Sequence, residues 1–395
     1  MDFNISPKSK DYLDRVKAFM KEHVYPFEQE LTDYNNQYNT DGDWTKWTQH
    51  PRVDEIRDLA KKAGLWNLFL PDEKDGQGLS VLDYAPIAEE MGRMFYASEM
   101  FNCNAPDTGN MEVLHLFGTE EQKETWLKPM LNGDIKSIFS MTEPDVASSD
   151  ATNIETTIIE DGDEIVINGR KWWSTGLGHP DAKIAIVMGK TDQSAERHKQ
   201  HSMVLVPLDT PGVKIVRMLK TFGAYDAPAG HGEVLYDNVR VPKKNIIKGF
   251  GAGFAIAQER LGPGRIHHCM RCIGAAERAL ELAIKRSASR VAFGKPLAKL
   301  GGNSERFAKA RIAIDQARLL TYYAAWKIDQ VGVRNCMTEI STIKVVAPNV
   351  LQEVTDWRYK FMVAEDFLTI IRLLAFSYKQ ELCEWQMDQM RCIWE

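Results

Sequence analysis

The stretch Phe139-Ser-Met-Thr-Glu-Pro-Asp-Val-Ala-Ser-Ser-Asp150, with Asn168-Gly-Arg-Lys-Trp-Trp-Ser-Thr-Gly176 further along the chain, decides how this sequence is interpreted. Small hydroxyl side chains are interleaved here with backbone amides, and two adjacent tryptophans offer flat apolar faces. A planar, hydrogen-bonding ring such as the isoalloxazine of a flavin needs both kinds of group. The hydroxyl groups belong to Thr142, Ser148, Ser149, Ser174 and Thr175, and the aromatic faces to Trp172 and Trp173.

A second interpretation of the same residues needs no ligand. Asn168-Gly169 lies between the apolar run Glu164-Ile-Val-Ile and the run Arg-Lys-Trp-Trp, and Asn-Gly is a strong signal for a two-residue hairpin turn. The two segments would then be a polar loop followed by a β-hairpin. On the residues alone, the flavin site and the plain hairpin both remain open.

Both segments resemble the acyl-CoA dehydrogenase family, in the branch whose loop reads Met-Thr-Glu-Pro-Asp-Val-Ala-Ser-Ser-Asp rather than being rich in glycine. Three distant stretches agree with the same family. They are Gly-Phe-Ala-Ile-Ala-Gln-Glu-Arg-Leu-Gly-Pro-Gly-Arg from Gly253, Ser-Arg-Val-Ala-Phe-Gly-Lys-Pro-Leu from Ser289, and the segment 340–356 with its Lys-Val-Val-Ala-Pro-Asn. The resemblance covers roughly residues 5–356.

The resemblance implies an FAD site, a fatty acyl-CoA substrate and a set of contact residues. Met141 and Thr142 would contact the flavin ring, and Arg290 would meet the FAD pyrophosphate, although it could also be a solvated helix arginine. A glutamine that many relatives place after Phe-Gly-Lys is replaced by Leu300-Gly-Gly-Asn303. The implied FAD contacts are Phe139, Ser140, Met141, Thr142, Ser148, Ser149, Trp172, Trp173, Ser174, Thr175 and Arg290, and the implied substrate contacts are Ser149 and Arg265.

Composition limits the class of protein. A net charge of -6 without a basic stripe argues against nucleic-acid binding, and 44% hydrophobic residues are ordinary for a globular chain. No apolar run is long enough to span a membrane, and the N-terminus lacks the features of a signal peptide. Six scattered cysteines fit a reducing interior. We therefore expect an intracellular protein, with mitochondrion, peroxisome and cytoplasm all left open.

The cluster His267-His268-Cys269-Met-Arg-Cys272 could suggest a metal site. Zinc sites need further ligands at defined spacing, and the sequence offers no partner Cys-x-x-Cys downstream. The cluster also falls within an apolar stripe at helical spacing. We therefore expect a core helix and no metal here, with the stripe formed by Ile266, Met270, Ile273, Leu280 and Ile284.

The hydrophobic period predicts a mainly α fold with a central β domain. Helical spacing holds over residues 1–137, where 111–130 reads as amphipathic helix, and returns in a C-terminal helical bundle over 246–395. Between them, residues 138–245 show short apolar runs separated by Gly, Pro, Asp and Asn, which predicts a small barrel-like β domain. The predicted strands begin near Glu164, Lys183, Ser202 and Glu233.

The end of the chain departs from the family. Relatives continue with a glycine-rich flavin-contacting turn and then Leu-Arg-(apolar)-Ala-Asp-Gly-Pro-Asp-Glu-Val-His, and neither motif occurs here. The run from Leu382 to Ile393 can, however, be coded so that reading from its third base gives Leu-Arg-Val-Ala-Asp-Gly-Pro-Asp-Glu-Val-His. We therefore predict a change of reading frame near Trp357, with a genuinely divergent tail over 357–395 as the alternative.

The function follows from the resemblance: an FAD-dependent acyl-CoA dehydrogenase that forms a trans-2-enoyl-CoA. Such a reaction needs a carboxylate to remove the α proton. The resemblance assigns this role to the aspartate of Ala-Asp-Gly-Pro, whose shifted codon spans Gln386 and Met387, so the catalytic base of the printed chain is unknown. A catalytically silent FAD- or acyl-CoA-binding relative and an oxidase are the alternatives. An electron-transfer flavoprotein as acceptor and a homodimer or homotetramer are expected from the family.

Overall fold

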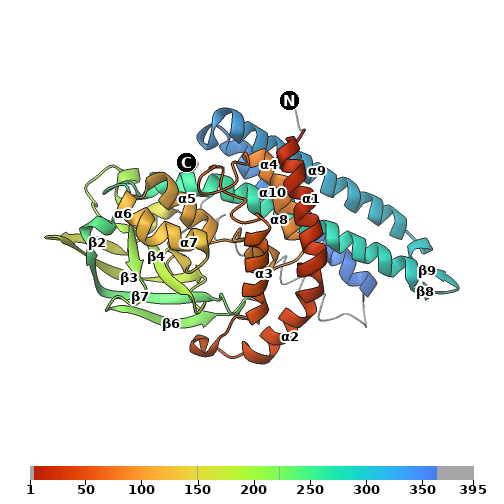
Figure 1. Ribbon diagram of the computed structural model, residues 1–395, viewed down its shortest axis with the longest axis horizontal. Helices are drawn as coiled ribbons and strands as arrows, with labels where there is room; N and C mark the ends of the chain where they lie inside the picture. The colour runs from red at the N-terminus through yellow and green to blue at the C-terminus, as the bar shows by residue number, and fades with distance from the viewer. Residues whose placement is uncertain (1–3, 149, 222, 363–395) are drawn as a thin grey trace. The chain divides into compact units, whose positions relative to one another are not determined.

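The computed structural model describes residues 4–148, 150–221 and 223–362. Its described residues divide into two compact units, one built from 27–70, 101–148, 150–221 and 223–261, the other from 4–26, 71–100 and 262–362. The expected fold class, mainly α with a central β domain, is confirmed (Figure 1). The predicted change of reading frame concerns residues that lie mostly outside the described part of the chain. The three-domain division stays a prediction.

The first unit contains a curled, seven-stranded mixed sheet (Figure 1). Its strand order is β1-β4-β2-β3-β7-β6, and β5 pairs with β4. Strand β4 pairs in parallel with β1 and β2, whereas the other pairs are antiparallel. The strands are β1 Lys136–Ser140, β2 Thr157–Asp161, β3 Glu164–Thr175, β4 Ala182–Lys190, β5 His201–Pro207, β6 Val213–Leu219 and β7 His231–Pro242.

The hairpin turn predicted at Asn168-Gly169 is wrong, because β3 runs through both residues. The turn lies instead at Gly162, which has a φ of 65° and joins β2 to β3. Gly169 is needed for close packing: a Cβ there would lie 2.2 Å from Oγ1 of Thr156. The ladder between β3 and β7 shifts register at this point. The glycine therefore marks a close approach inside a strand.

Helices of the same unit flank the sheet. The predicted amphipathic helix over 111–130 is broken, because Gly118 ends α5 and Thr119 starts α6 with a capping box to Gln122. Helix α5 is tied to β1, since the backbone N and the Oγ of Ser137 both donate to Asp107 Oδ1 at 2.7 Å. The helices are α2 Glu28–Tyr38, α3 Pro51–Lys62, α5 Asp107–Phe117, α6 Glu120–Gln122 and α7 Lys128–Asn132.

The second unit is helical. Its helices are α1 Pro7–Phe19, α4 Val81–Gly92, α9 Asn303–Val331 and α10 Met337–Met362, with a short ribbon of β8 Val291–Ala292 and β9 Lys295–Pro296. Helix α8, Gly253–Ser289, begins in the sheet-containing unit and continues here. Helices α4 and α8 pack closely: a Cβ on Gly274 would lie 1.9 Å from the carbonyl oxygen of Glu89. This glycine therefore lets the two backbones touch.

The His-Cys cluster lies on α8 and packs as a core helix. Ile266, Met270 and Ile273 are fully buried, and the ring of His267 lies 4.8 Å from that of Tyr84 in an edge-on arrangement. One part of the predicted stripe is wrong, because Ile284 is 44% exposed where α8 nears its end. Within the described ranges, no three His, Cys, Asp or Glu side chains are grouped as metal ligands would be.

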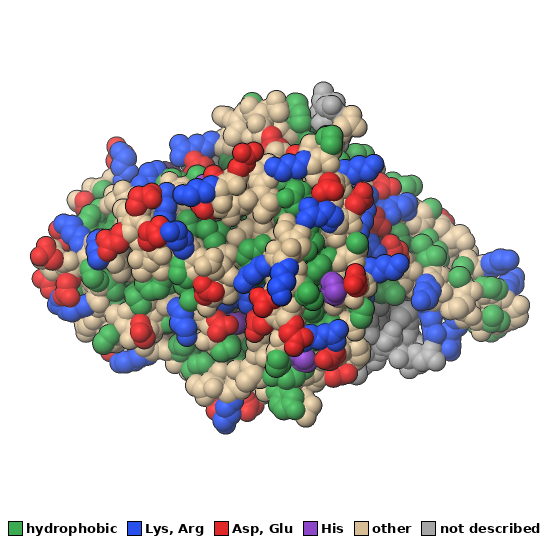
Figure 2. All heavy atoms as spheres, viewed as in Figure 1, with side chains coloured by type: hydrophobic (Ala, Val, Ile, Leu, Met, Phe, Trp, Pro, Cys, Tyr) green, Lys and Arg blue, Asp and Glu red, His purple; other side chains and the backbone are tan. Residues whose placement is uncertain are grey.

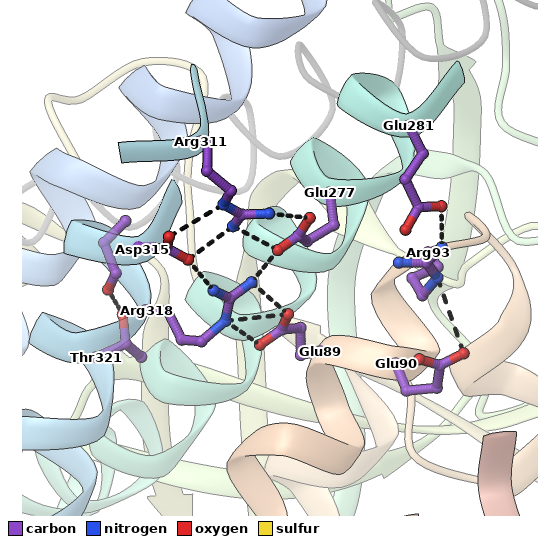
Figure 3. A network of polar contacts seen from close by, with 10 residues as sticks. Glu89, Glu90, Arg93, Glu277, Glu281, Arg311, Asp315, Arg318 and Thr321 are labelled. Carbon is purple, nitrogen blue, oxygen red and sulfur yellow. Dashed lines mark hydrogen bonds and ion pairs between the residues drawn. The ribbon is translucent and has the colours of Figure 1, made fainter. Parts of the chain in front are cut away.

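Charged side chains lie both on the surface of the protein and in a partly buried network of the helical unit. Figure 2 shows acidic and basic side chains intermingled on the face in view, without a stripe of one sign. Inside the helical unit, Arg318 of α9 joins Glu89 of α4 and Glu277 of α8 in a partly buried network (Figure 3). Of the helices that the structure describes, none is both long and apolar enough to cross a bilayer.

Candidate flavin site

The structure brings the two segments singled out from the sequence into direct contact. The loop after β1 and the end of β3 are joined by two hydrogen bonds: Trp172 N donates to Thr142 O at 3.1 Å, and Thr142 Oγ1 donates to Trp172 O at 2.8 Å. Two residues before Thr142 and two residues after Trp172, the hydroxyls of Ser140 and Ser174 lie 3.2 Å apart. The two predicted flavin segments of this unit therefore lie side by side.

A β-bulge presents the two tryptophans. The register between β3 and β7 shifts between Lys171 and Ser174, and Trp173 has a φ of 51°, a backbone conformation that a bulky residue rarely adopts. Bulges re-aim side chains next to functional sites. Both indole rings remain only partly buried, with centroids 6.1 Å apart. Two large aromatic faces are thus available beside the hydroxyl-rich loop.

Several of the predicted hydroxyl groups hold the site together internally. Ser140 and Ser174 are fully buried, and Tyr236 donates to Ser140 Oγ at 3.0 Å. Ser148 Oγ accepts from Glu143 N at 2.8 Å and closes the loop on itself. Thr175 Oγ1 lies 3.0 Å from Nδ1 of His231. These side chains shape the loop, so the partly exposed rings and the main chain are left to face a ligand.

A buried ion pair that the sequence did not reveal fixes the loop. Lys171 is completely buried on β3, and its Nζ donates to Met141 O at 2.7 Å and to Glu143 Oε1 at 2.8 Å. The carboxylate of Glu143 also accepts from the backbone N of Glu155 at 2.8 Å and of Thr156 at 2.9 Å. Burial lowers the pKa of Lys171 to about 8, against the attraction of Glu143.

A second polar group that the sequence did not reveal surrounds Arg260 at the start of α8. Its guanidinium carbon lies 3.9 Å from the centroid of the Phe139 ring, and Nε donates to Asn110 Oδ1 at 3.3 Å. On the other side, a Cβ on Gly109 would lie 2.9 Å from that Nε. Burial lowers the pKa of Arg260 to about 10, while nearby Glu112 raises it. The side chain is therefore held between an aromatic ring and helix α5.

Substitution E112Q is expected to make the protein less sensitive to alkaline pH. Burial raises the pKa of the Glu112 carboxyl from 4.5 to about 8, although Arg260 opposes the shift. Between these two values the unfolded chain has lost a proton that the folded protein keeps, so stability falls as pH rises. Glutamine is neutral throughout. Between pH 5 and pH 8, urea unfolding should show the stability of E112Q rising relative to that of the wild type by roughly 2–4 kcal/mol. The same dependence of stability on pH in both proteins would contradict this.

The remaining predicted residues lie elsewhere. Arg265 is buried on α8, whereas Arg290 is exposed just after that helix, with its backbone N bonded to Arg286 O at 2.9 Å. Both belong to the helical unit, and their contacts with FAD or substrate stay predictions. Ser149 is not among the described residues.

The residues present fit a flavin. The partly exposed rings of Phe139, Trp172 and Trp173 lie around a hydroxyl-rich loop that is rigidly held by Lys171. Flat apolar faces next to hydrogen-bonding groups are what an isoalloxazine ring requires. The fold and these residues fit a flavin-dependent oxidoreductase.

Family models identify the family. The N-terminal, middle and C-terminal domains of acyl-CoA dehydrogenases match residues 6–134, 138–239 and 251–358. The chain belongs to the acyl-CoA dehydrogenase family, whose members are FAD-dependent enzymes. The last match ends at residue 358, close to the point where the sequence predicts a change of reading frame.

Relatives and solved structures agree. The chain is 54% identical to acyl-CoA dehydrogenase family member 11 of Gallus gallus, covering 90% of this chain but 45% of that one. It is also 54% identical to "Probable acyl-CoA dehydrogenase FadE2" of Mycobacterium tuberculosis, covering 90% and 86%. A structure of butyryl-CoA dehydrogenase from Megasphaera elsdenii superposes with a TM-score of 0.81 at 25% identity, covering 100% and 99%. The chain thus spans about half the length of several curated relatives.

Proposed function

We propose that this chain catalyses the α,β-dehydrogenation of a fatty acyl-CoA to the trans-2-enoyl-CoA. The observation that carries the proposal is the joining of the Met-Thr-Glu-Pro loop to the Trp172-Trp173 bulge through Thr142, in a member of the acyl-CoA dehydrogenase family. Bound FAD supplies the acceptor for the hydride that leaves the β carbon. An electron-transfer flavoprotein as reoxidising partner and a homodimer or homotetramer are part of the same proposal.

The chain's own residues would bind and orient. The partly exposed rings of Trp172 and Trp173 would pack on the flavin, while Lys171 and Ser148 keep the loop that carries Met141 and Thr142 in one conformation. Preorganised groups of this kind lose little entropy when a ligand binds. Arg290 would hold the pyrophosphate, and Arg265 with Ser149 would meet the acyl-CoA.

No residue of this chain is assigned as the catalytic base. Removal of the α proton requires a carboxylate within reach of the substrate. The family resemblance assigns it to an aspartate that the printed frame replaces across Gln386 and Met387. The alternative function, a silent FAD- or acyl-CoA-binding relative, rests on this one difference. Resequencing the gene and transcript across codons 350–395 decides which tail the organism makes.

Anaerobic bleaching of the flavin tests the activity. We expect the chain with the restored Ala-Asp-Gly-Pro frame to lose its visible flavin absorbance when acyl-CoA is added, across a panel of chain lengths and branched forms. The printed chain, used as the matched control, should bind FAD without bleaching because it lacks the base. If the restored chain also fails to bleach with every acyl-CoA, the proposed function is wrong. Peroxide formation during turnover in air would favour an oxidase instead.

A further inference from the structure

We propose that Arg260 tunes the bound FAD, because its fixed positive charge beside strand β1 makes the flavin easier to reduce. This inference rests on the proposed flavin site. Reduction by two electrons and one proton leaves one extra negative charge on the ring, and a nearby cation stabilises that charge.

Arg260 is held in place on both faces of its guanidinium. The Phe139 ring covers one face, with its centroid 3.9 Å from the guanidinium carbon. Helix α5 covers the other, and a Cβ at Gly109 would stand 3.1 Å from Nη2. Glycine at this position therefore makes room for the guanidinium. A planar cation packed in this way keeps one orientation, so its charge acts from a fixed place.

The strand beneath Arg260 leads directly to the predicted flavin residues. Ile138 belongs to the buried core of the sheet, so the partly exposed Phe139 points to the opposite face of β1. Strand β1 ends at Ser140 and Met141 is the next residue, so Met141 lies within about 7 Å of Phe139 along the chain. Met141 is predicted to contact the ring. Arg260 is therefore next to the face that would carry the flavin.

The guanidinium is also incompletely used. Among the described residues, its one hydrogen bond is the 3.3 Å contact from Nε to Asn110, so both terminal nitrogens remain free to act on a ligand. Glu112 lies one turn from Gly109 on α5 and is buried, and its charge attracts that of Arg260. A structural ion pair would normally be closed by direct hydrogen bonds. Glu112 instead leaves the cation available, and its carboxylate moderates the field of Arg260 only above its raised pKa of about 8.

The test compares two substitutions that should shift the flavin reduction potential in opposite directions. Purified protein with bound FAD is equilibrated anaerobically with a reference dye at pH 9, where Glu112 is ionised. At a fixed dye ratio, R260M should hold about tenfold less reduced flavin than the wild type, and E112Q several-fold more. R260K keeps the charge and should stay within about threefold of the wild type. E121Q removes an exposed carboxylate of α6 and should change nothing.

Opposite shifts for R260M and E112Q support the proposal, because a merely structural role would weaken FAD binding without moving the potential in two directions. Shifts of the same sign, or no shift in either variant, overturn it. If R260M does not fold, the direction of the E112Q shift decides. A wild-type chain that binds no FAD at all would refute the proposed function as well, whereas bound FAD with an unmoved potential refutes this inference alone.

Discussion

Replacing Lys171 with methionine is expected to destabilise the protein by roughly 3–5 kcal/mol, since it leaves the carboxylate of Glu143 buried without its cation. Lys171 is completely buried and Glu143 nearly so. Burial by itself raises the pKa of Glu143, but the attraction and hydrogen bond of Lys171, with the hydrogen bonds from Thr156 and Glu155, outweigh it, so the pKa of Glu143 is lowered. The two charges are therefore coupled in the folded state, and an apolar replacement of one of them leaves the other buried and unpaired.

A double-mutant cycle measures this coupling. K171M and E143Q are unfolded in urea singly and together, and the double variant should lose less than the sum of the two single losses. K183M, which removes an exposed lysine of β4, is the matched control and should change stability by less than about 0.5 kcal/mol. Because Lys171 also binds Met141 O, K171M should retain less FAD after gel filtration. Stability equal to that of K183M would contradict the role given to this pair.

Local signals in the sequence predicted four strands of the sheet. The runs from Glu164, Lys183, Ser202 and Glu233 became β3, β4, β5 and β7. Strands β1, β2 and β6 were not predicted; the second half of β2 is exposed and ends in Glu160 and Asp161. Asn168-Gly169 misled the turn assignment, since the glycine serves a close contact with Thr156 that no local pattern shows.

The candidate site was also predicted only in part. The loop and the two tryptophans are contiguous motifs, so their chemistry could be read directly. The charges that hold the site could not: Lys171 meets Glu143 across 28 residues of sequence, and Arg260 meets Asn110 across 150. Only the fold shows that these chains are buried together. A lysine directly before the two tryptophans was the one available hint.

Substituting Arg318 with methionine is expected to cost about 3–5 kcal/mol in the helical unit. Arg318 donates to both carboxylate oxygens of Glu89 at 2.8 and 2.9 Å, to Asp315 at 2.6 Å, and also to Glu277 (Figure 3). It thereby connects α4, α8 and α9 through one side chain. Burial raises the pKa of Glu89, and Arg318 opposes this rise.

The sign of the pH dependence separates a lost ion pair from lost packing. Without Arg318, the pKa of Glu89 rises further above its ordinary value, so unfolding releases a proton over a wider range and stability falls more steeply as pH increases from 5 to 8. R311M is the matched control: Arg311 is 40% exposed, and Glu277 would keep its bond to Arg318. Its loss should stay near 1 kcal/mol. If R318M loses the same free energy of unfolding at pH 5 and at pH 8, the loss comes from packing. A lost ion pair would instead cost more at pH 8, because without Arg318 the carboxyl of Glu89 is neutral only at the lower pH.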